Sequence, residues 1–453
     1  MPVTTLHPDY ANFKKQRDRV LLCLKGQDAI KDADQSLLPA TTGMKKNWDV
    51  PLASGMGTVG QVTYAGYKQR ARFYAKTSQA RDNIIGVMFG ESNEAEDAEV
   101  VTNDGLTALQ LAKEATRDIL QSGRSVLVVD APTEGGQPYI TRYAADALIN
   151  WKTSPDNKNE LILAVISEST GKAAADEFSH DTEDRYRVYR LINGAVTLGV
   201  YNEKGEELEM GRDIALNFIP VIAIGSIDCS PEYDPIPLLP IAECCISAYQ
   251  KDAEYAQARF MSAHPTPAVR GVSDTHFTGI ASAGIGSGAI WHLGDQDGAD
   301  AFFLETSGNG LEHLKNAVDD ELRQADYLSA RLMQAGSAAE SAQALQIRDD
   351  SQKASIYTIA EAVAEGLNRA IDWRAEWANE KPDFISIALN KPAEQPNPQM
   401  ITSLIAGING DLLPRSTLYS YLRDTKMTAL SDDEIVSEIE SAPMPKAAAM
   451  NGI

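Results

Sequence analysis

Residues 240–263, PIAECCISAYQKDAEYAQARFMSA, and residues 311–333, LEHLKNAVDDELRQADYLSARLM, decide the fold, because both predict long helices. At about 1.5 Å per residue, each helix is roughly 35 Å long. The second helix carries an apolar stripe with a mean step close to 3.5, the spacing that lets helices pack in nearly parallel pairs. The stripe consists of Leu311, Leu314, Val318, Leu322, Ala325, Leu328 and Leu332.

A Gly-rich insert, residues 264–310, separates these two helices. Its glycines and apolar pairs, such as Ile290-Trp291 and Phe302-Phe303, predict short strands with tight turns. A break of small residues at 336–339 follows the second helix, and a third helical pattern runs over 341–379. No catalytic motif accompanies this order of elements, which is more typical of a mechanical or assembly part than of an enzyme pocket.

Size and charge limit the classes of function. The 453 residues suffice for two to four packed units, and 43% hydrophobic residues allow a real core. The chain holds 41 Lys and Arg against 64 Asp and Glu, a net charge of −23. This balance argues against gripping nucleic acid through phosphate neutralisation, but it permits nucleic acid to slide past without adhering.

Cysteines and histidines give no sign of a metal or redox site. Cys23, Cys229, Cys244 and Cys245 lack metal-ligand spacing, which predicts free thiols in a reducing cytoplasm. The six histidines also lack ligand spacing, so we expect no metal and no cofactor. The first residues, which lack a basic segment followed by an apolar one, predict no secretion signal, and no apolar run approaches the length that spans a bilayer.

The part before residue 236 reads as α+β, with an antiparallel sheet and helices beside it. Asn193-Gly194 predicts a hairpin turn, because both turn positions need positive φ. Helices are predicted over 10–26, 64–85 and 105–121, and strands over 125–129, 161–168, 186–192, 196–202 and 218–224. After a Pro-rich linker at 391–398, further helices are predicted over 400–408 and up to about 422, and Ser431 caps a final one.

Three short motifs have better structural than catalytic interpretations. Gly55-Met56-Gly57-Thr58-Val59-Gly60 matches the glycine-rich phosphate fingerprint, but no strand precedes it, so a flexible loop is predicted. Ser169-Thr170-Gly171-Lys172 lacks the upstream Gly of a phosphate loop and predicts a strand-ending turn. Gly284-Ile285-Gly286-Ser287-Gly288 does not fit a nucleophile elbow and predicts a hairpin turn.

Acidic side chains outnumber basic ones on the second long helix. The candidates for a functional acidic wall are Glu312, Asp319, Asp320 and Asp326. Their simplest interpretation is a solvated helix face. The functional interpretation is a wall facing a polyanion that must not adhere.

Several stretches together resemble the portal proteins of tailed bacteriophages, over most of the chain. The resemblance rests on residues 104–106 and 122–130, 137–140 and 149–151, 218–221 and 237–242 running into the 249–255 helix. It continues through Pro265-Thr266-Pro267, Gly271, the insert ending Ala289-Ile290-Trp291, and Glu340-Ser341-Ala342-Gln343-Ala344.

The resemblance implies a division of the chain into the parts of a portal subunit. An α/β wing would span residues 1–235, a first stem helix 236–263, a small β-containing clip 264–310 and a second stem helix 311–335. A tunnel loop would span 336–343, a long wing helix and strand 344–392, and a short helical crown with the tail 393–453. The implied site residues are Ser337, Glu340, Ser341 and Gln343 in the tunnel loop, and Gly284, Gly286, Gly288 and Trp291 in the clip.

The resemblance also implies a non-enzymatic function. A head-to-tail ring of about twelve identical subunits would form a DNA channel at one capsid vertex of the virion, assembled in the host cytoplasm. Implied partners are the terminase large subunit, head–tail adaptor proteins, the major capsid and scaffolding proteins, and double-stranded DNA that passes through during packaging and ejection. Two alternatives remain: a capsid adaptor or minor head protein without a channel, and a nucleotide-binding α+β enzyme using Gly55–Gly60.

Overall fold

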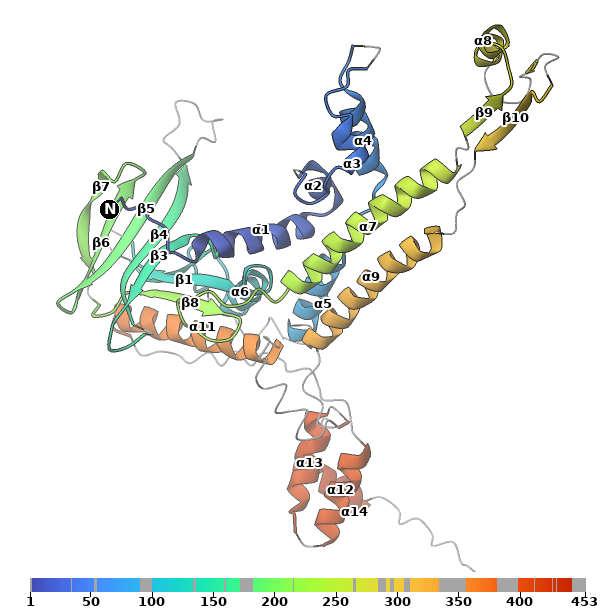
Figure 1. Ribbon diagram of the computed structural model, residues 1–453. Coiled ribbons are helices and arrows are strands. Elements are labelled where there is room, and N and C mark those ends of the chain that lie inside the picture. The colour runs from blue at the N-terminus through green and yellow to red at the C-terminus, as the bar shows by residue number, and fades with distance from the viewer. Residues whose placement is uncertain are drawn as a thin grey trace, which may run out of the picture.

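The computed structural model describes most of the 453 residues (Figure 1). The described residues are 2–33, 35–52, 55–89, 100–132, 136–158, 160–171, 182–214, 216–263, 266–283, 291–293, 297–304, 310–333, 356–380, 398–410, 412–425, 427–428 and 430–441.

The described helices and strands make a mixed α+β protein, as the sequence predicts. The helices are α1 (Tyr10–Lys25), α2 (Gln27–Asp32), α3 (Thr42–Lys46), α4 (Val59–Arg70), α5 (Lys76–Phe89), α6 (Ala108–Ser122), α7 (Leu239–Ala263), α8 (Asp274–Ala283), α9 (Leu311–Met333), α11 (Ile356–Ala378), α12 (Pro398–Asn409), α13 (Arg415–Asp424) and α14 (Asp432–Ser441). The strands are β1 (Arg124–Asp130), β2 (Tyr139–Tyr143), β3 (Leu148–Thr153), β4 (Leu161–Gly171), β5 (Thr182–Ile192), β6 (Ala195–Asn202), β7 (Glu207–Ile214), β8 (Val221–Gly225), β9 (Thr266–Arg270) and β10 (Asp300–Leu304).

The body consists of three layers around strand β1. A three-stranded antiparallel sheet, β2-β1-β8, lies between helices α6 and α11 on one face and the five-stranded meander β3-β4-β5-β6-β7 on the other. Side chains of a strand alternate between faces, so Leu127 and Val129 enter the helical core while Val126 and Val128 enter the core between the sheets. Every residue of β1 is buried, as expected for a strand covered on both sides.

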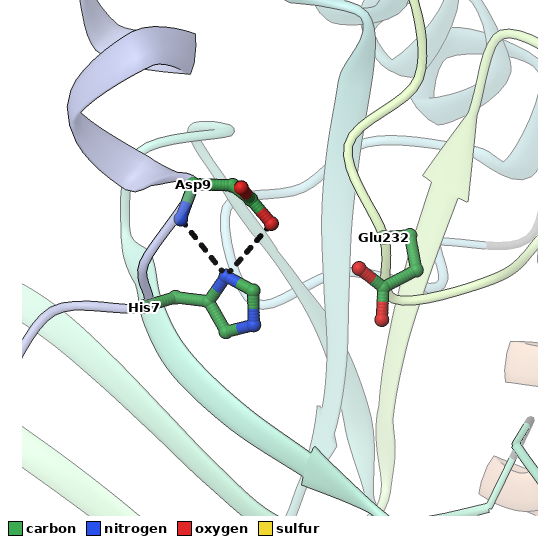
Figure 2. A group of neighbouring side chains, drawn as sticks. All are labelled: His7, Asp9 and Glu232. Atoms are coloured by element: carbon green, nitrogen blue, oxygen red, sulfur yellow. Dashed lines mark hydrogen bonds and ion pairs between the residues drawn. The ribbon is translucent and has the colours of Figure 1, made fainter.

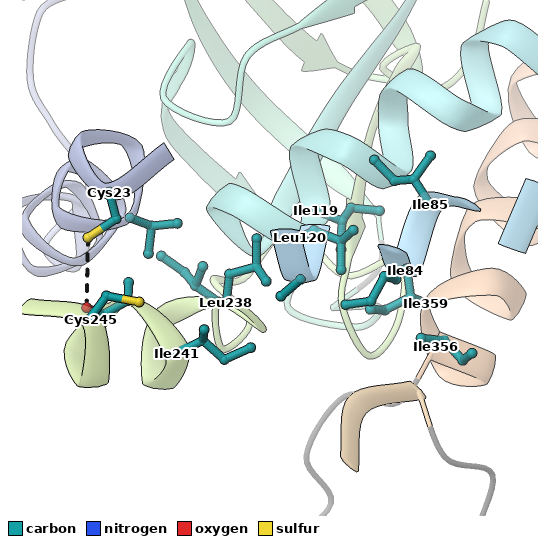
Figure 3. Close-up of a cluster of buried hydrophobic side chains, with 14 of the residues drawn as sticks. Cys23, Ile84, Ile85, Ile119, Leu120, Leu238, Ile241, Cys245, Ile356 and Ile359 are labelled. Atoms are coloured by element: carbon teal, nitrogen blue, oxygen red, sulfur yellow. Dashed lines mark hydrogen bonds between the residues drawn. The ribbon is translucent and has the colours of Figure 1, made fainter. Parts of the chain in front are cut away.

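The helical core joins the body to the base of the long helices (Figure 3). Ile84 and Ile85 from α5, Ile119 and Leu120 from α6, and Ile241 from α7 pack in one cluster. Helix α6 begins with a capping box at Thr107 and ends at Gly123, whose φ of +71° is left-handed. A Cβ at Gly123 would lie 2.6 Å from the Asp234 carbonyl oxygen, so this position requires glycine for two reasons.

One predicted helix is wrong. Instead of one helix over 64–85, two helices, α4 and α5, flank an extended segment. The backbone N–H of Arg72 donates to Asp252 Oδ2 (2.6 Å), and that of Phe73 donates to Gln27 Oε1 (3.3 Å). These side chains from distant helices replace the intrahelical bonds, and the local sequence contains no Gly or Pro that marks the break.

The remaining differences are elements that the sequence did not predict, and two predicted turns and caps are confirmed. Strands β2, β3 and β7 were not predicted, and neither were helices α2, α3 and α8. The Asn193-Gly194 hairpin is confirmed, with φ values of +52° and +80°. The cap at Ser431 is also confirmed, because Ser431 N–H donates to Glu434 Oε2 at 2.8 Å. The third helix runs over Ile356–Ala378, and the first part of its predicted range lies outside the described residues.

Candidate functional site: the helical hairpin and its tip

The helical hairpin, helices α7 and α9, leaves the body as an antiparallel pair (Figure 1). The helices have 25 and 23 residues, which gives lengths of about 37 and 35 Å at about 1.5 Å per residue. The predicted stripe of α9 packs on α7, and Val318 and Ala325 at its centre are the buried residues of α9. The Lys251 ammonium and the Glu321 carboxylate meet at 2.5 Å and fix the register of the pair.

The two ends of α7 differ sharply in burial. Its buried residues lie between Ile241 and Ala253, where α1, α4 and α5 pack against it. Beyond Ala253 no residue of α7 is buried, so the distal part of the helix stands outside the core. Arg70 of α4 supports this part, because its guanidinium lies 4.3 Å from the Phe260 ring centre and 2.5 Å from Gln257 Oε1.

The contact between the hairpin helices carries a charge-dependent hydrogen bond. Partial burial of Glu321 acts to raise its pKa, but bonds from Lys251 and Ser247 outweigh burial and hold the pKa below the ordinary value. Cys244 lies beside this carboxylate, and burial raises the pKa of its thiol to about 11. A thiol with a raised pKa is a poor nucleophile, so Cys244 has a packing role here.

The four candidate wall acids occupy different surroundings. Glu312 and Asp319 are exposed on α9. Asp320 pairs with Arg323 one turn along the same helix, at 2.6 Å. Asp326 pairs with Lys76 of α5, at 2.9 Å, so it ties α9 to the body of its own chain. Two of the four therefore have basic partners within the same chain, which the sequence did not reveal.

The tip of the hairpin is a separate small unit. Strands β9 and β10 pair antiparallel, with Phe302 opposite Ala268, and helix α8 follows β9. This confirms short strands in the insert. Trp291 is half-buried, whereas Gly284, Gly286 and Gly288 lie outside the described residues. The predicted tunnel-loop residues Ser337, Glu340, Ser341 and Gln343 also lie outside them.

Large apolar side chains are exposed along the hairpin and the tip. Tyr327 on α9 is 60% exposed, Phe277 on α8 is 56% exposed and Phe303 on β10 is 53% exposed. Phe260 and Phe302 are exposed as well, and all the exposed phenylalanines of the described residues lie on the hairpin or its tip. Aromatic side chains are enriched in protein interfaces, so this surface is suited to contact with another protein.

The glycine-rich stretch before α4 has structural reasons for its glycines. It follows helix α3, not a strand, and Gly55 and Gly57 have φ values of +72° and +88°. At Gly60 a Cβ would lie 2.5 Å from the Met44 carbonyl oxygen and 2.7 Å from Trp48 Cα, so α4 approaches α3 closely there. The described residues form a hydrogen-bonded turn, with Val59 N–H donating to Val50 O at 2.8 Å.

A fully buried arginine fixes the segment that leads into α7. The Arg124 guanidinium donates to the carbonyl oxygens of Pro231, Ala145 and Leu148 at 2.9–3.0 Å. It lies 4.2 Å from the Tyr233 ring centre. Burial lowers its pKa, while Tyr233 and Glu232 act in the opposite direction.

His7, Asp9 and Glu232 lie close together near this arginine (Figure 2). One possible ligand atom from each lies within 4.8 Å of the others, and Asp9 and Glu232 are exposed. His7 stacks on Trp151, with ring centres 3.9 Å apart, and Trp151 Nε1 donates to Glu232 at 3.5 Å. These contacts, with the nearby cationic guanidinium, give the three residues a structural role in holding the N-terminal segment.

The body also holds a cleft of about 440 Å³ beside β8 and α11, lined partly by Phe218, Trp373 and Cys229. Its charged lining residues are Glu160 and Arg369, and Arg369 pairs with Glu365 at 2.5 Å. Burial raises the pKa of Cys229 to about 12, so its thiol is not activated. Among the described residues that line the cleft, the cysteine is therefore not an activated nucleophile.

The segment that contains the hairpin matches a known family model. Residues 237–378 match a domain of unknown function, DUF4055. The match begins just before α7 and ends with α11, so it covers the hairpin, its tip and the long helix but less than half of the chain. Among curated proteins, no relative matches the chain.

Two solved structures are similar to the chain. One, titled "Virion of native gene transfer agent (GTA) particle", is 13% identical at a TM-score of 0.38, over 81% of this chain and 90% of that chain. The other, titled "Neck of empty GTA particle computed with C6 symmetry", is 14% identical at a TM-score of 0.36, over 88% of this chain and 100% of that chain. No helix in the described part of the chain is long and apolar enough to cross a membrane.

Proposed function

We propose that this chain is the subunit of a portal-type ring, a non-enzymatic DNA channel at one vertex of a phage or phage-like capsid. The observation that carries the proposal is the helical hairpin. It projects from a well-packed body, ends in its own small β unit and exposes aromatic side chains over its length. A closed ring buries such surfaces between neighbouring subunits.

Burial on the two hairpin helices supports assembly rather than isolated function. In the single chain, α9 has two buried residues among 23, and the distal part of α7 has none. Fully burying one large apolar side chain contributes about 1.5–3 kcal/mol. Several such side chains repeated around a ring of about twelve subunits give a strong drive for closure.

The net charge of −23 supports a channel rather than a gripping site. Exposed acids such as Glu312 and Asp319 repel phosphates, so DNA would pass the stem without adhering. The proposed partners are the terminase large subunit during packaging, head–tail adaptor proteins afterwards, and the major capsid and scaffolding proteins around the ring. We expect no cofactor, because the ATP-driven step belongs to the terminase.

Native mass spectrometry of the purified chain, with negative-stain images of the same sample, tests the proposal. The expected result is a ring of about twelve copies of the 49.1 kDa chain, with a central hole. A chain that remains monomeric both alone and with its scaffolding protein would refute the channel. A matched variant without residues 266–304 should keep a folded body and lose ring closure or terminase docking.

A further inference from the structure

The charge of the chain is unevenly distributed. Residues 1–80 hold twelve Lys and Arg against six Asp and Glu, a balance of +6, so the other 373 residues carry −29. This first part forms helices α1 to α4 and the start of α5. A chain that is strongly acidic as a whole therefore carries a basic helical region beside its hairpin, which the overall composition conceals (Figure 1).

Many basic residues of this region already have partners within the chain. Arg17 pairs with Asp146 at 2.9 Å, Arg19 with Glu243 at 3.5 Å and Lys76, the first residue of α5, with Asp326 at 2.9 Å. Lys45 and Lys46, at the end of α3, are exposed and have no ion-pair partner among the described residues. Their charges are therefore available to another molecule.

Exposed apolar side chains accompany the two lysines. Met56 is 80% exposed, and Val50 and Val62 are also largely exposed. Together with Lys45 and Lys46 they define what we call the α3–α4 knob, residues 41–52 and 55–62, in which the two lysines outnumber the one acid, Asp49. Surfaces that bind phosphate backbones are made of basic and polar groups, whereas protein interfaces combine an apolar centre with a charged rim. The composition of the knob therefore favours a protein partner over nucleic acid.

The knob is held in a fixed shape. The Thr41 hydroxyl caps α3, Val59 N–H donates to Val50 O at 2.8 Å, and Gly60 N–H donates to Asn47 O at 2.9 Å. Trp48 packs against Tyr64, with ring centres 5.9 Å apart. A preorganised surface loses little conformational entropy on binding, which favours a docking role.

The position of the knob relative to α9 suits contact between copies. Helix α4 packs on α7, and α9 packs on another side of α7 (Figure 1). A subunit in a head-to-tail ring meets its two neighbours through two different surfaces. The basic knob lies on one side of the hairpin, and the rest of the chain, which a neighbour would present to it, is acidic.

We propose that the α3–α4 knob docks on an acidic surface of a second copy of this chain. Lys45 and Lys46 supply ion pairs across the contact, and Met56, Val50 and Val62 supply its apolar centre. The inference rests on the proposed ring and adds which surface of each subunit closes it. Charge complementarity also selects against knob-to-knob contacts, because two basic surfaces repel each other.

The test compares Lys45→Glu/Lys46→Glu with the control Lys158→Glu/Lys204→Glu, which reverses two exposed lysines on turns of the five-stranded sheet. We expect the knob variant to raise the protein concentration needed for half-assembly by about tenfold or more, and the control to leave it near the wild-type value. Circular dichroism and thermal unfolding of each monomer check that both variants fold.

A second measurement identifies the contact directly. Rings assembled from a mixture of unlabelled and ¹⁵N-labelled chains are treated with a carbodiimide, which joins lysine amines to carboxylates in contact. We expect mixed-isotope crosslinks from Lys45 or Lys46 to carboxylates outside residues 1–80. Crosslinks confined to single chains, or none from these lysines in intact rings, would overturn the docking surface.

The outcomes separate the two proposals. A wild-type chain that forms no ring overturns the proposed function and the docking surface together. Rings that close equally well with the knob variant overturn the docking surface alone. If the variant assembles normally but loses affinity for a fluorescent 30-base-pair DNA duplex, the knob binds nucleic acid, and the second-copy proposal is wrong.

Discussion

The body and the hairpin of this protein are built on different principles. Strand β1 is buried on both faces. Its hydrogen-bonding partners β2 and β8, and the layers that cover it, all belong to the same chain. Helix α9 has a stripe covered by α7 and a wider surface left exposed. The comparison teaches that the body buries its core within one chain, whereas the hairpin leaves apolar surface exposed, which the proposed ring would cover.

The largest expected effect on stability comes from the buried arginine of the body. Arg124→Met should lower the free energy of unfolding by about 3–5 kcal/mol, because three carbonyl oxygens lose their donors and Glu232 loses a counter-charge. Urea denaturation followed by tryptophan fluorescence measures the change. Arg259→Met on the exposed distal part of α7 is the control, with an expected change of about 0.5 kcal/mol or less. Equal effects of the two variants would contradict the contrast between body and hairpin.

A smaller effect is expected at the base of the knob. Gly60→Ala places a Cβ within 2.7 Å of the Trp48 and Met44 backbones, so α4 must shift, at a cost of about 1–3 kcal/mol. Gly43→Ala, where a Cβ meets nothing within 4 Å, serves as the control and should be neutral or slightly stabilising. Thermal unfolding of both variants checks this. A harmless Gly60→Ala would contradict the close approach of α4 to α3 at this position.

A pH-dependent effect is expected within the hairpin. The folded pKa of Glu321 lies below its unfolded value of 4.5, so the carboxylate stabilises the fold above that value and loses its contribution as pH falls through the folded pKa. Because the pair with Lys251 is partly exposed, Glu321→Gln should cost about 0.5–1 kcal/mol at neutral pH. Urea unfolding at neutral pH and at successively lower pH values below 4.5 should show this difference shrinking on acidification. A difference that is constant with pH would show that the pair does not depend on charge.

Removing the exposed aromatic side chains of the tip should have the smallest effect on stability and a large effect on assembly. Phe302→Ser/Phe303→Ser removes two exposed aromatic rings from the tip, so the free energy of unfolding should change by about 0.5 kcal/mol or less. Ring closure or partner docking should fall sharply, because buried aromatic side chains dominate interface energies. Sedimentation velocity measures assembly, and Leu208→Ser, at an exposed apolar site on β7, is the control. Unchanged assembly would remove the tip from the interface.

The elements with strong periodic patterns were predictable. The apolar stripe predicted a helix over residues 311–333, and α9 spans Leu311–Met333. The prediction succeeded because a 23-residue amphipathic helix repeats its pattern over several turns. The Asn193-Gly194 turn was equally clear, since its backbone needs φ values that these residues adopt readily.

The elements that tertiary contacts define were not predictable. The break between α4 and α5 depends on Asp252 and Gln27, which lie far away in sequence. Strand β7, with the sequence ELEMGRDI, has little β propensity and owes its conformation to pairing with β6. The ion pair of Asp326 could not be predicted from the sequence, since Asp326 meets Lys76 only when α5 packs on α9. The pair of Asp320 with Arg323, three residues along α9, was not predicted either. The basic knob could have been found from charge counted by region rather than over the whole chain.

The most direct test of the central claim is the mass and shape of the native assembly. The account predicts closed rings of about twelve 49.1 kDa chains, with a central hole and the hairpins packed around it. A single well-folded monomer that never closes into a ring, even with its scaffolding protein present, would contradict the claim that the hairpin is an assembly surface.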